Sequence, residues 1–411
     1  MTHPQIDAQL VEDMILQLGQ IGRHSETGVW RTAFSPEWVA ANEVVAGWGR
    51  DAGLDVHYDT GGNLWSVAKG REDGPSIVTG SHIDSQCPGG RYDGALGVIA
   101  GMVAVCALVG QFGQPRRTLE VVSLCEEEGS RFPTAGFWGS RALVGRASPD
   151  DCDTVKDAQG ISIGAAMTEV GFDPAKIGET VRDDIAAFIE LHIEQGPILE
   201  DADLPVAIVD AITHIRQTEV TLHGASNHAG AFPMDIRADP MAGFAEIASG
   251  VIGHAEALGR PAVTTIGHCV PDPGGRAIIP RTVTFTIDAR HPDPEAAAQI
   301  YAAHLALIED VATRRGLTFN STILLDHPAC QSDPALLSAL DAAAARMDVP
   351  VLHMASGAGH DAQQMAQICS VAMLFVRSFE GRSHTPEEFS SVSDCVAGIK
   401  VLAAALYDLA Y

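Results

Sequence analysis

The apolar residues near the start of the chain repeat at helical spacing. Those between Leu10 and Leu18 fall on one face of a helix, and residues 39–48 repeat the pattern. Two runs of alternating apolar and polar residues follow, at 54–58 and 64–68, and this alternation is typical of strands. The chain therefore begins with helices and then enters a sheet.

A strand, a helix and a second strand come next. The apolar run 77–79 leads into Gly80-Ser81-His82, residues 94–110 form a charge-free apolar stretch, and residues 119–124 again have strand character. The stretch 94–110 is a few residues short of a bilayer span and rich in Gly and Ala, so we expect a buried helix. This order predicts a βαβ unit, in which ligands bind beyond the carboxyl ends of the strands. A further apolar strand, 186–193, also ends beside a histidine.

From about residue 213 the pattern changes to a shorter, self-contained unit of about 115 residues. We expect strand 218–223, helix 239–258, strand 262–270, strand 282–290, helix 294–316 and strand 317–325. The order βαββαβ is the ferredoxin-like split βαβ. The larger pattern then returns, with helix 333–347, strand 371–376 and a last helix from Ser391. The sequence thus predicts an α/β fold in which a domain of residues 1–212 and 328–411 carries an inserted domain of residues 213–327.

Composition narrows the class of protein. The 411 residues are 46% hydrophobic, which is enough for proper cores, and the formal net charge is −27. A surface this acidic repels polyanions, so we expect neither nucleic acid nor a membrane as partner. The N-terminus has no basic segment followed by an apolar core, and the eight cysteines are scattered singly. Both features favour a reducing, cytoplasmic location.

Imidazoles and carboxylates gather where the strands of the larger domain end. They are His82, Asp84, Asp93, Glu127, Glu128, His192, Asp361 and His384. One histidine at a strand end is more often structural than a ligand, but the repeated coincidence within one domain favours a metal site. These donors, without cysteine, suit zinc, manganese, cobalt or nickel. Two such ions about 3.5–4 Å apart activate water for attack on a carbonyl group.

The spacing of these residues suggests separate roles. In a strand, alternate residues point the same way, so Asp84 can orient the imidazole of His82. Glu127 and Glu128 are adjacent at a strand end and point apart, so one carboxylate can bind metal while the other transfers the proton of the attacking water.

Six segments resemble motifs of the M20 metallohydrolases, and within them of the hydantoinase/carbamoylase amidases. The resemblance extends from about residue 75 to 390 in matching order. These amidases include N-carbamoyl-L-amino acid hydrolase, β-ureidopropionase and allantoate amidohydrolase. The segments are GSHID with GGRYDG, EEEGSRF, ELHIEQGP, NHAGAFPMDIRAD, SGAGHDA and GRSHTPEE.

The resemblance implies a mixed-sheet catalytic domain with two divalent ions, and an inserted lid that also forms a homodimer. It implies that one ion is bound by His82 and His192, the other by Glu128 and His384, and that Asp93 bridges them. Glu127 becomes the general base. A second register, with Glu126 as base and Glu127 as ligand, stays open, because Glu126 occupies the place of the family's asparagine.

The resemblance also implies that Gln195, His228 and Arg290 contact the substrate, with His228 and His360 taking part in catalysis. A guanidinium matches a carboxylate, and an imidazole can donate a hydrogen bond to an oxygen that gains charge. His228 and Arg290 lie in the inserted domain, so the lid must close for catalysis. Ala277 stands where the family usually has an asparagine that helps to bind the substrate carboxylate.

We therefore expect a two-metal amidohydrolase that cleaves the linear amide bond of an N-carbamoyl or N-acyl amino acid, a small carboxylate-bearing substrate. Hydrolysis of allantoate or ureidoglycolate is one alternative, and an aminopeptidase or dipeptidase is another. A catalytically inactive binding protein is a third possibility, but it would require the loss of ligands, and none is missing.

Overall fold

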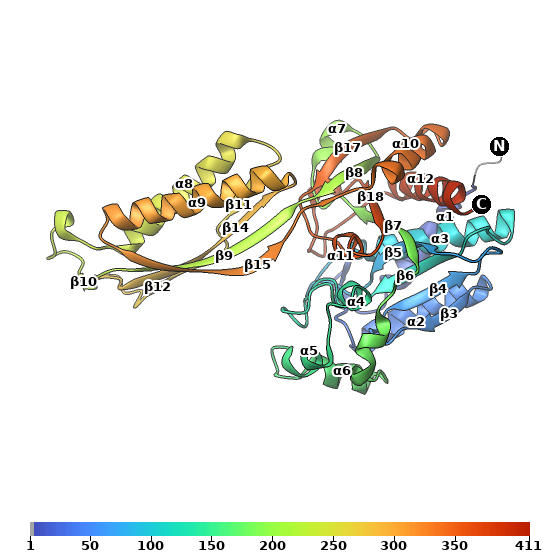
Figure 1. The fold of residues 1–411 in the computed structure, drawn as a ribbon, viewed down its shortest axis with the longest axis horizontal. Helices are drawn as coiled ribbons and strands as arrows, with labels where there is room; N and C mark the ends of the chain where they lie inside the picture. Colours follow the sequence, from blue (N-terminus) through green and yellow to red (C-terminus); the bar gives the residue numbers. More distant parts are fainter. Residues whose placement is uncertain (1–3) are drawn as a thin grey trace. The chain divides into compact units, whose positions relative to one another are not determined.

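The computed structural model describes residues 4–411, which divide into two compact units (Figure 1). The first contains the chain up to Asp210 together with residues 332–354 and 360–411, and the second contains residues 211–331 and 355–359. A large mixed sheet forms the first unit and a separate antiparallel sheet the second. This confirms the predicted α/β fold.

The first unit begins with alternating helices and strands. Its elements up to the second unit are α1 (Ala8–Leu18), β1 (Arg23–His24), β2 (Gly28–Val29), α2 (Pro36–Asp51), β3 (Asp55–Tyr58), β4 (Leu64–Ala68), β5 (Ser76–His82), α3 (Ala95–Phe112), β6 (Leu119–Leu124), α4 (Trp138–Leu143), α5 (Pro149–Thr154), α6 (Ile163–Glu169), β7 (Ile185–Ile193), α7 (Ile198–Ala202) and β8 (Val206–Ile212). After the second unit come α10 (Pro334–Arg346), β17 (Val351–Ser356), α11 (Asp361–Met365), β18 (Ser370–Val376) and α12 (Val392–Ala410).

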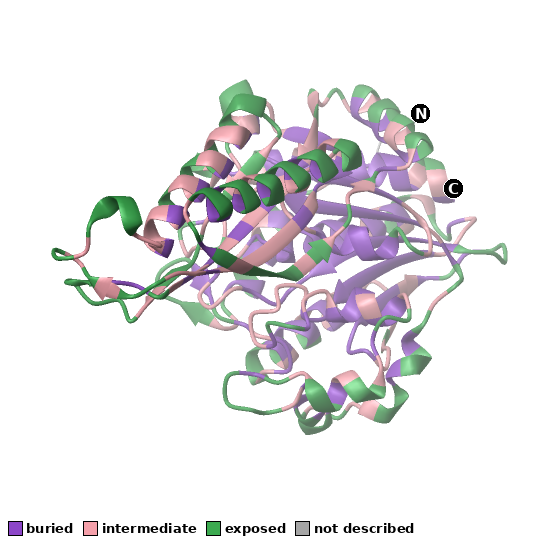
Figure 2. Ribbon diagram, turned by 60° about the vertical axis from the view of Figure 1, so that its left-hand side comes forward, coloured by how far each residue is buried: buried purple, intermediate pink, exposed green. Residues whose placement is uncertain are grey.

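The large sheet has a parallel centre. Its strand order is β16-β8-β18-β7-β5-β6-β4-β3, where β16 is Cys330–Gln331, with β17 paired to β8. The neighbours β18, β7, β5 and β6 run parallel, whereas β8, β4 and β3 pair antiparallel. Every residue of β5 and β6 is buried, and Figure 2 shows the strands of this sheet largely in the colour of buried residues. The carboxyl ends of the parallel strands therefore meet at one buried edge.

Helix α3 connects β5 to β6 and packs on the centre of the sheet. It is the one helix of residues 4–411 long and apolar enough to cross a membrane, yet 67% of it is buried inside the protein. Most of its residues from Ala95 to Leu108 belong to the main hydrophobic core. This confirms both the buried helix and the βαβ unit that the sequence predicts.

Four helices begin with a capping serine or aspartate that is followed by a proline. Ser35, Asp239, Asp293 and Asp333 each accept a backbone N–H of the first turn, and a proline follows each of them. The cap satisfies a donor that lacks an intrahelical partner, and proline is tolerated where no such donor is needed. These dipeptides therefore fix the start of four helices locally.

The second unit contains the antiparallel sheet and two long helices, α8 and α9, which cover one face of it (Figure 1). The sheet order is β11-β14-β9-β15, with β12 also paired to β14. The elements are β9 (His214–His223), β10 (Asn227–His228), α8 (Pro240–Leu258), β11 (Val263–Thr265), β12 (Cys269–Asp272), β13 (Ile278–Ile279), β14 (Thr282–His291), α9 (Pro294–Arg314), β15 (Thr318–His327) and β16 (Cys330–Gln331).

Two local predictions differ from the structure. The single strand expected at 262–270 is two strands, β11 and β12, because residues 266–268, including Gly267, interrupt it. The carbonyl oxygen of His268 still accepts the backbone N–H of Thr286 at 3.2 Å. The sequence analysis also missed α4 to α6, β8 and β17. Helices α4 to α6 have six or seven residues each, too few for helical periodicity to stand out.

Candidate metal centre

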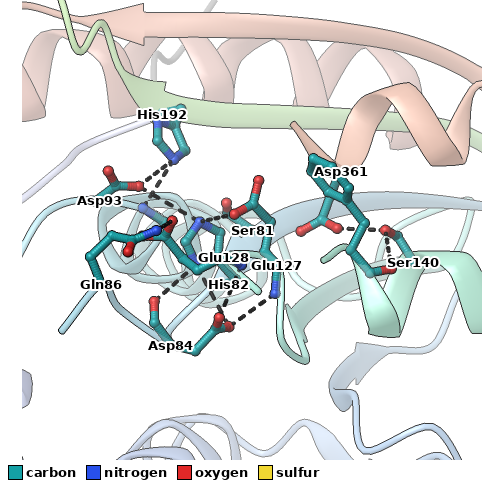
Figure 3. Close-up of polar contacts among 12 residues, drawn as sticks. Ser81, His82, Asp84, Gln86, Asp93, Glu127, Glu128, Ser140, His192 and Asp361 are labelled. Atoms are coloured by element: carbon teal, nitrogen blue, oxygen red, sulfur yellow. Dashed lines mark hydrogen bonds and ion pairs between the residues drawn. The ribbon is translucent and has the colours of Figure 1, made fainter. Parts of the chain in front are cut away.

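Parallel pairing brings the predicted ligands to one place. His82 is the last residue of β5, His192 is the penultimate residue of β7, and Glu127 and Glu128 follow β6. Because β7, β5 and β6 are parallel neighbours, their carboxyl ends adjoin. Asp93 joins them from the loop between β5 and α3 (Figure 3).

Gly94 lets this loop pass close to His82. Its φ is +58°, and a Cβ atom there would lie 2.3 Å from the His82 ring. No other residue type fits, because the conformation is left-handed and a side chain would overlap the imidazole. Glycine at this position therefore allows Asp93 to face His82.

Two groups of ligand atoms share Asp93. His82, Asp93 and His192 form one group, and Asp93, Glu128 and His384 the other, with the ligand atoms of each group within 4.8 Å of one another. In the first, the Nε2 atoms of His82 and His192 lie 3.7 and 3.1 Å from Oδ1 of Asp93. In the second, Nε2 of His384 lies 3.4 Å from Oδ2 of Asp93 and 3.5 Å from Oε2 of Glu128. Asp93 therefore offers one oxygen to each group.

Backbone carbonyls set the orientation of both buried imidazoles. Nδ1 of His82 lies 3.0 Å from the carbonyl oxygen of Asp84, and Nδ1 of His192 lies 3.0 Å from that of Ile193. Each Nδ1 can therefore carry the proton and donate it, which leaves Nε2 as the unprotonated nitrogen of each ring. This is the tautomer that a metal ligand requires. In His192, Nε2 lies near Asp93 and also accepts the backbone N–H of Gly94 at 3.0 Å.

The charges of the cluster are unbalanced. Burial, followed by the charge of Glu128, raises the pKa of Glu127 well above its ordinary value. Burial and Asp93 do the same to the pKa of Glu128. Burial opposes protonation of His192, but Asp93 raises its pKa to about 9. Carboxylates packed this closely repel one another, and cations among them would remove the repulsion.

Buried oxygen atoms of the cluster that accept no hydrogen bond are suited to binding metal ions. Oε1 of Glu128 and Oε1 of Gln195 are buried and have no hydrogen-bond partner among residues 4–411. The donors are imidazole nitrogens and carboxylate oxygens, which suit first-row divalent ions. Unsatisfied buried oxygens are costly in a protein interior, and coordination would satisfy them. The residues therefore fit two ions that share Asp93.

Glu126 and Glu127 have different surroundings. Oε1 of Glu126 accepts the backbone N–H groups of Phe132 and Arg131, at 2.7 and 3.2 Å, so this carboxylate closes the following loop. Oε2 of Glu127 instead lies 3.6 Å from Nε2 of His82. Glu127 faces the cluster without belonging to either ligand group, whereas Oε1 of Glu126 is held by backbone N–H groups of its own loop.

Asp84 orients the imidazole of His82 mainly through its backbone carbonyl group, whereas the sequence predicted a contact through its side chain. Its carbonyl oxygen makes the close contact with His82, and its carboxylate lies farther away, at 3.7 Å from Nδ1. The carboxylate accepts the backbone N–H groups of Glu127 and Glu128, at 3.3 and 3.2 Å (Figure 3). Asp84 thus fixes both the imidazole and the loop that carries the two glutamates.

The sequence analysis missed three residues that hold the ligands in place. Glu388 is buried and accepts the backbone N–H groups of Tyr92 and Asp93, each at 2.9 Å. Ser383 donates to Oδ2 of Asp93 at 2.6 Å, and Gln86 donates to Oε2 of Glu128 at 2.7 Å. Ser383 and Glu388 lie beside His384 in the segment GRSHTPEE, so proximity to a predicted ligand was the available signal.

Gln195 and His360 also adjoin the cluster. Nε2 of Gln195 donates to Oδ2 of Asp93 at 2.8 Å, and the residue has a left-handed φ of 60°. His360 is buried, and its ring meets that of His192 edge to face, with centroids 4.7 Å apart. Burial, followed by His192, lowers the pKa of His360 well below its ordinary value, which keeps the ring neutral.

His228 and Arg290 belong to the second unit. Nδ1 of His228 accepts the backbone N–H groups of Gly230 and Ala231, at 3.1 and 3.0 Å. In its neutral form the ring therefore carries the proton on Nε2, as a hydrogen-bond donor. Arg290 forms a two-point ion pair with Asp288. Ala277 provides only a backbone contact, accepting the N–H of Ala229.

Residues 78–408 match the family model described as peptidase family M20/M25/M40. The chain is 36% identical to the allantoate amidohydrolase of Escherichia coli, over 98% of both chains. It is also 36% identical to the N-carbamoyl-L-amino acid amidohydrolase of Geobacillus stearothermophilus, over 98% of this chain and 99% of that protein.

A crystal structure of a hydantoinase/carbamoylase family amidase from Burkholderia multivorans has the same fold. The TM-score is 0.90 and the identity 32%, with 98% of each chain covered. The two amidohydrolases are equally similar to this chain although their names give different substrates. Overall identity therefore does not distinguish between those substrates.

Proposed function

Because this chain belongs to peptidase family M20/M25/M40, and within it to the hydantoinase/carbamoylase amidohydrolases that cleave carbon–nitrogen bonds other than peptide bonds, we propose that it hydrolyses a small ureido or N-carbamoyl compound bearing a carboxylate. Hydrolysis consumes one water and releases an amine, ammonia and carbon dioxide. The observation that carries the proposal is the pair of ligand groups that share Asp93.

We propose that His82 and His192 would hold one divalent ion and Glu128 and His384 a second, with Asp93 available to both groups. When bound, such a pair makes water more acidic and stabilises negative charge on a carbonyl oxygen. The carbonyls of Asp84 and Ile193 support this assignment, because they place the proton of each buried imidazole on Nδ1 and leave Nε2 as the unprotonated nitrogen that can coordinate a metal.

Glu127 serves as the general base. It faces the cluster, while Asp84 holds the backbone of its loop through the N–H groups of Glu127 and Glu128. The carboxylate takes a proton from the attacking water and passes it to the leaving nitrogen. Glu126 is unsuited to this role, because its Oε1 already accepts two backbone N–H groups.

Gln195, His228, Arg290 and His360 contact the substrate or the developing charge. The backbone donors to Nδ1 of His228 leave Nε2–H as a donor for an oxygen that gains charge. Arg290 supplies hydrogen bonds to the carboxylate. His228 and Arg290 belong to the second unit, and the ligand groups belong to the first.

A substrate panel tests the reaction class. The metal-depleted protein, supplied separately with Mn²⁺, Co²⁺ or Zn²⁺, should release ammonia from allantoate, 3-ureidopropionate or N-carbamoyl-L-amino acids. Glycyl-leucine serves as the peptide control. Turnover of the dipeptide above that of every ureido compound would contradict the proposal.

A cytoplasmic location and a homodimer also remain proposals. The eight free thiols, scattered over the chain, support a reducing compartment. Cell fractionation would test the location, and sedimentation equilibrium would test the assembly.

A further inference from the structure

His360 is carried by a short helix and not by a strand of the sheet. It is the N-terminal cap of α11 and the first residue of the first unit after residues 355–359, which belong to the second. Its ring contacts those of His192 in β7 and Phe375 in β18, with centroids 4.7 and 5.6 Å away. His192 and Phe375 are register partners in these two parallel strands. The position of the His360 ring therefore depends on how α11 is fixed to the sheet.

Glu190 fixes α11 to two strands. It lies in β7, two residues before His192, and is fully buried. Its Oε2 accepts the backbone N–H of Ala362, in the first turn of α11, at 3.0 Å. Its Oε1 accepts the hydroxyl group of Ser81, the residue before His82 in β5, at 2.7 Å. One carboxylate thus joins the ends of β5 and β7 to the start of α11.

Asp361 gives α11 a second anchor. Its Oδ1 accepts the hydroxyl group of Ser140 in α4 at 2.5 Å (Figure 3). The backbone N–H of Trp138, at the start of α4, donates in turn to the carbonyl oxygen of Glu126 at 3.1 Å. Asp361 therefore ties α11 to the loop that carries Glu127.

These hydrogen bonds have no substitute in the interior. Glu190, Ser81 and Ala362 are all fully buried. An apolar side chain at position 190 would leave the N–H of Ala362 and the hydroxyl group of Ser81 without a partner, which is unfavourable away from water. We expect α11 to move until new partners are found. A displacement of about 1 Å near a reacting group can lower a rate about 100-fold.

We propose that Glu190 is a positioning residue that holds His360 against His192, with Asp361 as a second anchor. This inference rests on the proposed function, in which His360 contacts the substrate or the developing charge, and deepens it. Glu190 belongs to neither ligand group and acts through His360. Because the charge on the substrate oxygen develops in the transition state, a displaced His360 lowers kcat and leaves KM nearly unchanged.

Two substitutions of Glu190 separate hydrogen bonding from size. In the full-length metal-loaded protein, Glu190→Met keeps the length of the side chain and removes both acceptor oxygens. It should lower kcat about 10- to 100-fold, with KM within about threefold and the metal content unchanged. Glu190→Gln keeps an acceptor for Ala362 and can donate to the hydroxyl oxygen of Ser81, so it should restore kcat to within about fivefold of the wild type.

Steady-state kinetics and plasma emission spectrometry measure these quantities. A glutamine variant as slow as the methionine variant overturns the inference, because hydrogen bonding then does not explain the loss. Loss of metal from Glu190→Met overturns it as well.

A double-mutant cycle tests whether Glu190 acts through His360. In the His360→Gln background, Glu190→Met should lower kcat by no more than about a further twofold, because the interaction that it disturbs is already absent. A general structural role would lower kcat by the same factor in both backgrounds, and that result overturns the inference.

Ser81 offers a milder change if Glu190→Met folds poorly. Ser81→Ala removes one of the two hydrogen bonds to Glu190 and should lower kcat about 3- to 10-fold. Ser123→Ala is the matched control, since Ser123 is the register partner of Ser81 in β6, is also buried, and has no hydrogen-bond partner for its hydroxyl group among residues 4–411. It should keep kcat within about twofold. Equal effects of the two alanine variants overturn the inference.

Nuclear magnetic resonance of the histidine rings tests the position of His360 without turnover. In the full-length zinc-loaded protein with isotope-labelled histidine, the His360 signal is assigned with His360→Gln. Glu190→Met should shift this signal, Glu190→Gln should shift it less, and neither should move the signal of His228 in the second unit. An unchanged His360 signal in Glu190→Met overturns the inference whatever the activity. If the wild type hydrolyses no ureido compound with any metal, the proposed function fails, and these spectra alone decide the positioning role.

Discussion

Adjacent carboxylates at the end of β6 have different surroundings. Glu126 accepts two backbone N–H groups of its own loop, and Glu127 faces the imidazole of His82. A glutamine at position 126 keeps an acceptor oxygen for these bonds. A glutamine at 127 keeps the shape of the side chain but cannot accept the proton of a water molecule.

We therefore expect Glu127→Gln to lower kcat at least about 100-fold while the metal content stays unchanged. Glu126→Gln is the matched control and should retain kcat within a few-fold. Steady-state kinetics and plasma emission spectrometry measure both quantities. A loss of turnover confined to the Glu126 variant would instead support the second register, with Glu126 as base.

At the scale of elements, helix α3 depends on close contact with two strands. A Cβ atom at Gly97 would lie 2.2 Å from the carbonyl oxygen of Leu191 and 2.7 Å from Cβ of Ser81. Leu191 and Ser81 directly precede His192 and His82. The packing of α3 on β5 and β7 is therefore coupled to the position of two predicted ligands.

Gly97→Ala should lower the free energy of unfolding by about 1–3 kcal/mol, because backbone atoms of β7 have to move. Gly110→Ala in the same helix is the control, since a Cβ there meets no atom within 4 Å. Alanine loses less backbone entropy than glycine when a helix forms, so Gly110→Ala should stabilise the protein by up to about 1 kcal/mol. Urea unfolding compares them, and equal effects would contradict the packing argument.

His353 joins three elements of the first unit. From β17 its Nδ1 lies 2.7 Å from Oδ1 of Asp210 in β8, and its Nε2 lies 2.9 Å from Oδ1 of Asp341 in α10. The hydrogen bonds to Asp210 and Asp341 raise the pKa of His353. Protonation is therefore more favourable in the folded than in the unfolded chain.

Because the pKa of His353 is higher in the folded than in the unfolded protein, its protonation stabilises the folded state. This stabilisation is complete at a pH below the pKa in the unfolded chain, about 6.5, and is lost as the pH rises through the pKa in the folded protein. The difference in unfolding free energy between the wild type and His353→Gln should thus be larger at pH 6 than at pH 9. The site is half-exposed, so we expect less than about 1 kcal/mol. His57→Gln, at an exposed position of β3, is the control, and a difference independent of pH would contradict the assignment.

For the whole molecule, all members of the two ligand groups belong to the first unit. A ligand that binds only the folded state stabilises it in proportion to the logarithm of its concentration over Kd. Metal removal should therefore destabilise the first unit, while the core of the second unit, built by β9, β14, α8 and α9, is independent of metal.

We expect EDTA treatment to lower the Tm of the first unit by several degrees and to abolish turnover, with both restored by Mn²⁺, Co²⁺ or Zn²⁺. About two ions per chain should be recovered. Calorimetry with and without metal measures the shift. An active protein free of metal, or a Tm unaffected by its removal, would contradict the binuclear assignment.

The sequence alone determined the elements and the set of candidate ligands. Helical and strand periodicity are local properties, so α3, β6, α10 and the order of elements in the second unit could be predicted from them. The candidate metal ligands could be predicted as well, because apolar strands that end in His, Asp or Glu present those side chains at the edge of a parallel sheet.

The tertiary structure decided which neighbours these residues meet. The sequence favours Glu127 as base but leaves the register with Glu126 open, and the hydrogen bond that closes the loop from Phe132 to Glu126 separates the two residues. The support that Glu388 gives to Asp93 and the hold of Asp288 on Arg290 are likewise set by folding. Hydrogen bonds between residues distant in the chain depend on strand pairing and loop closure, which a local pattern does not contain.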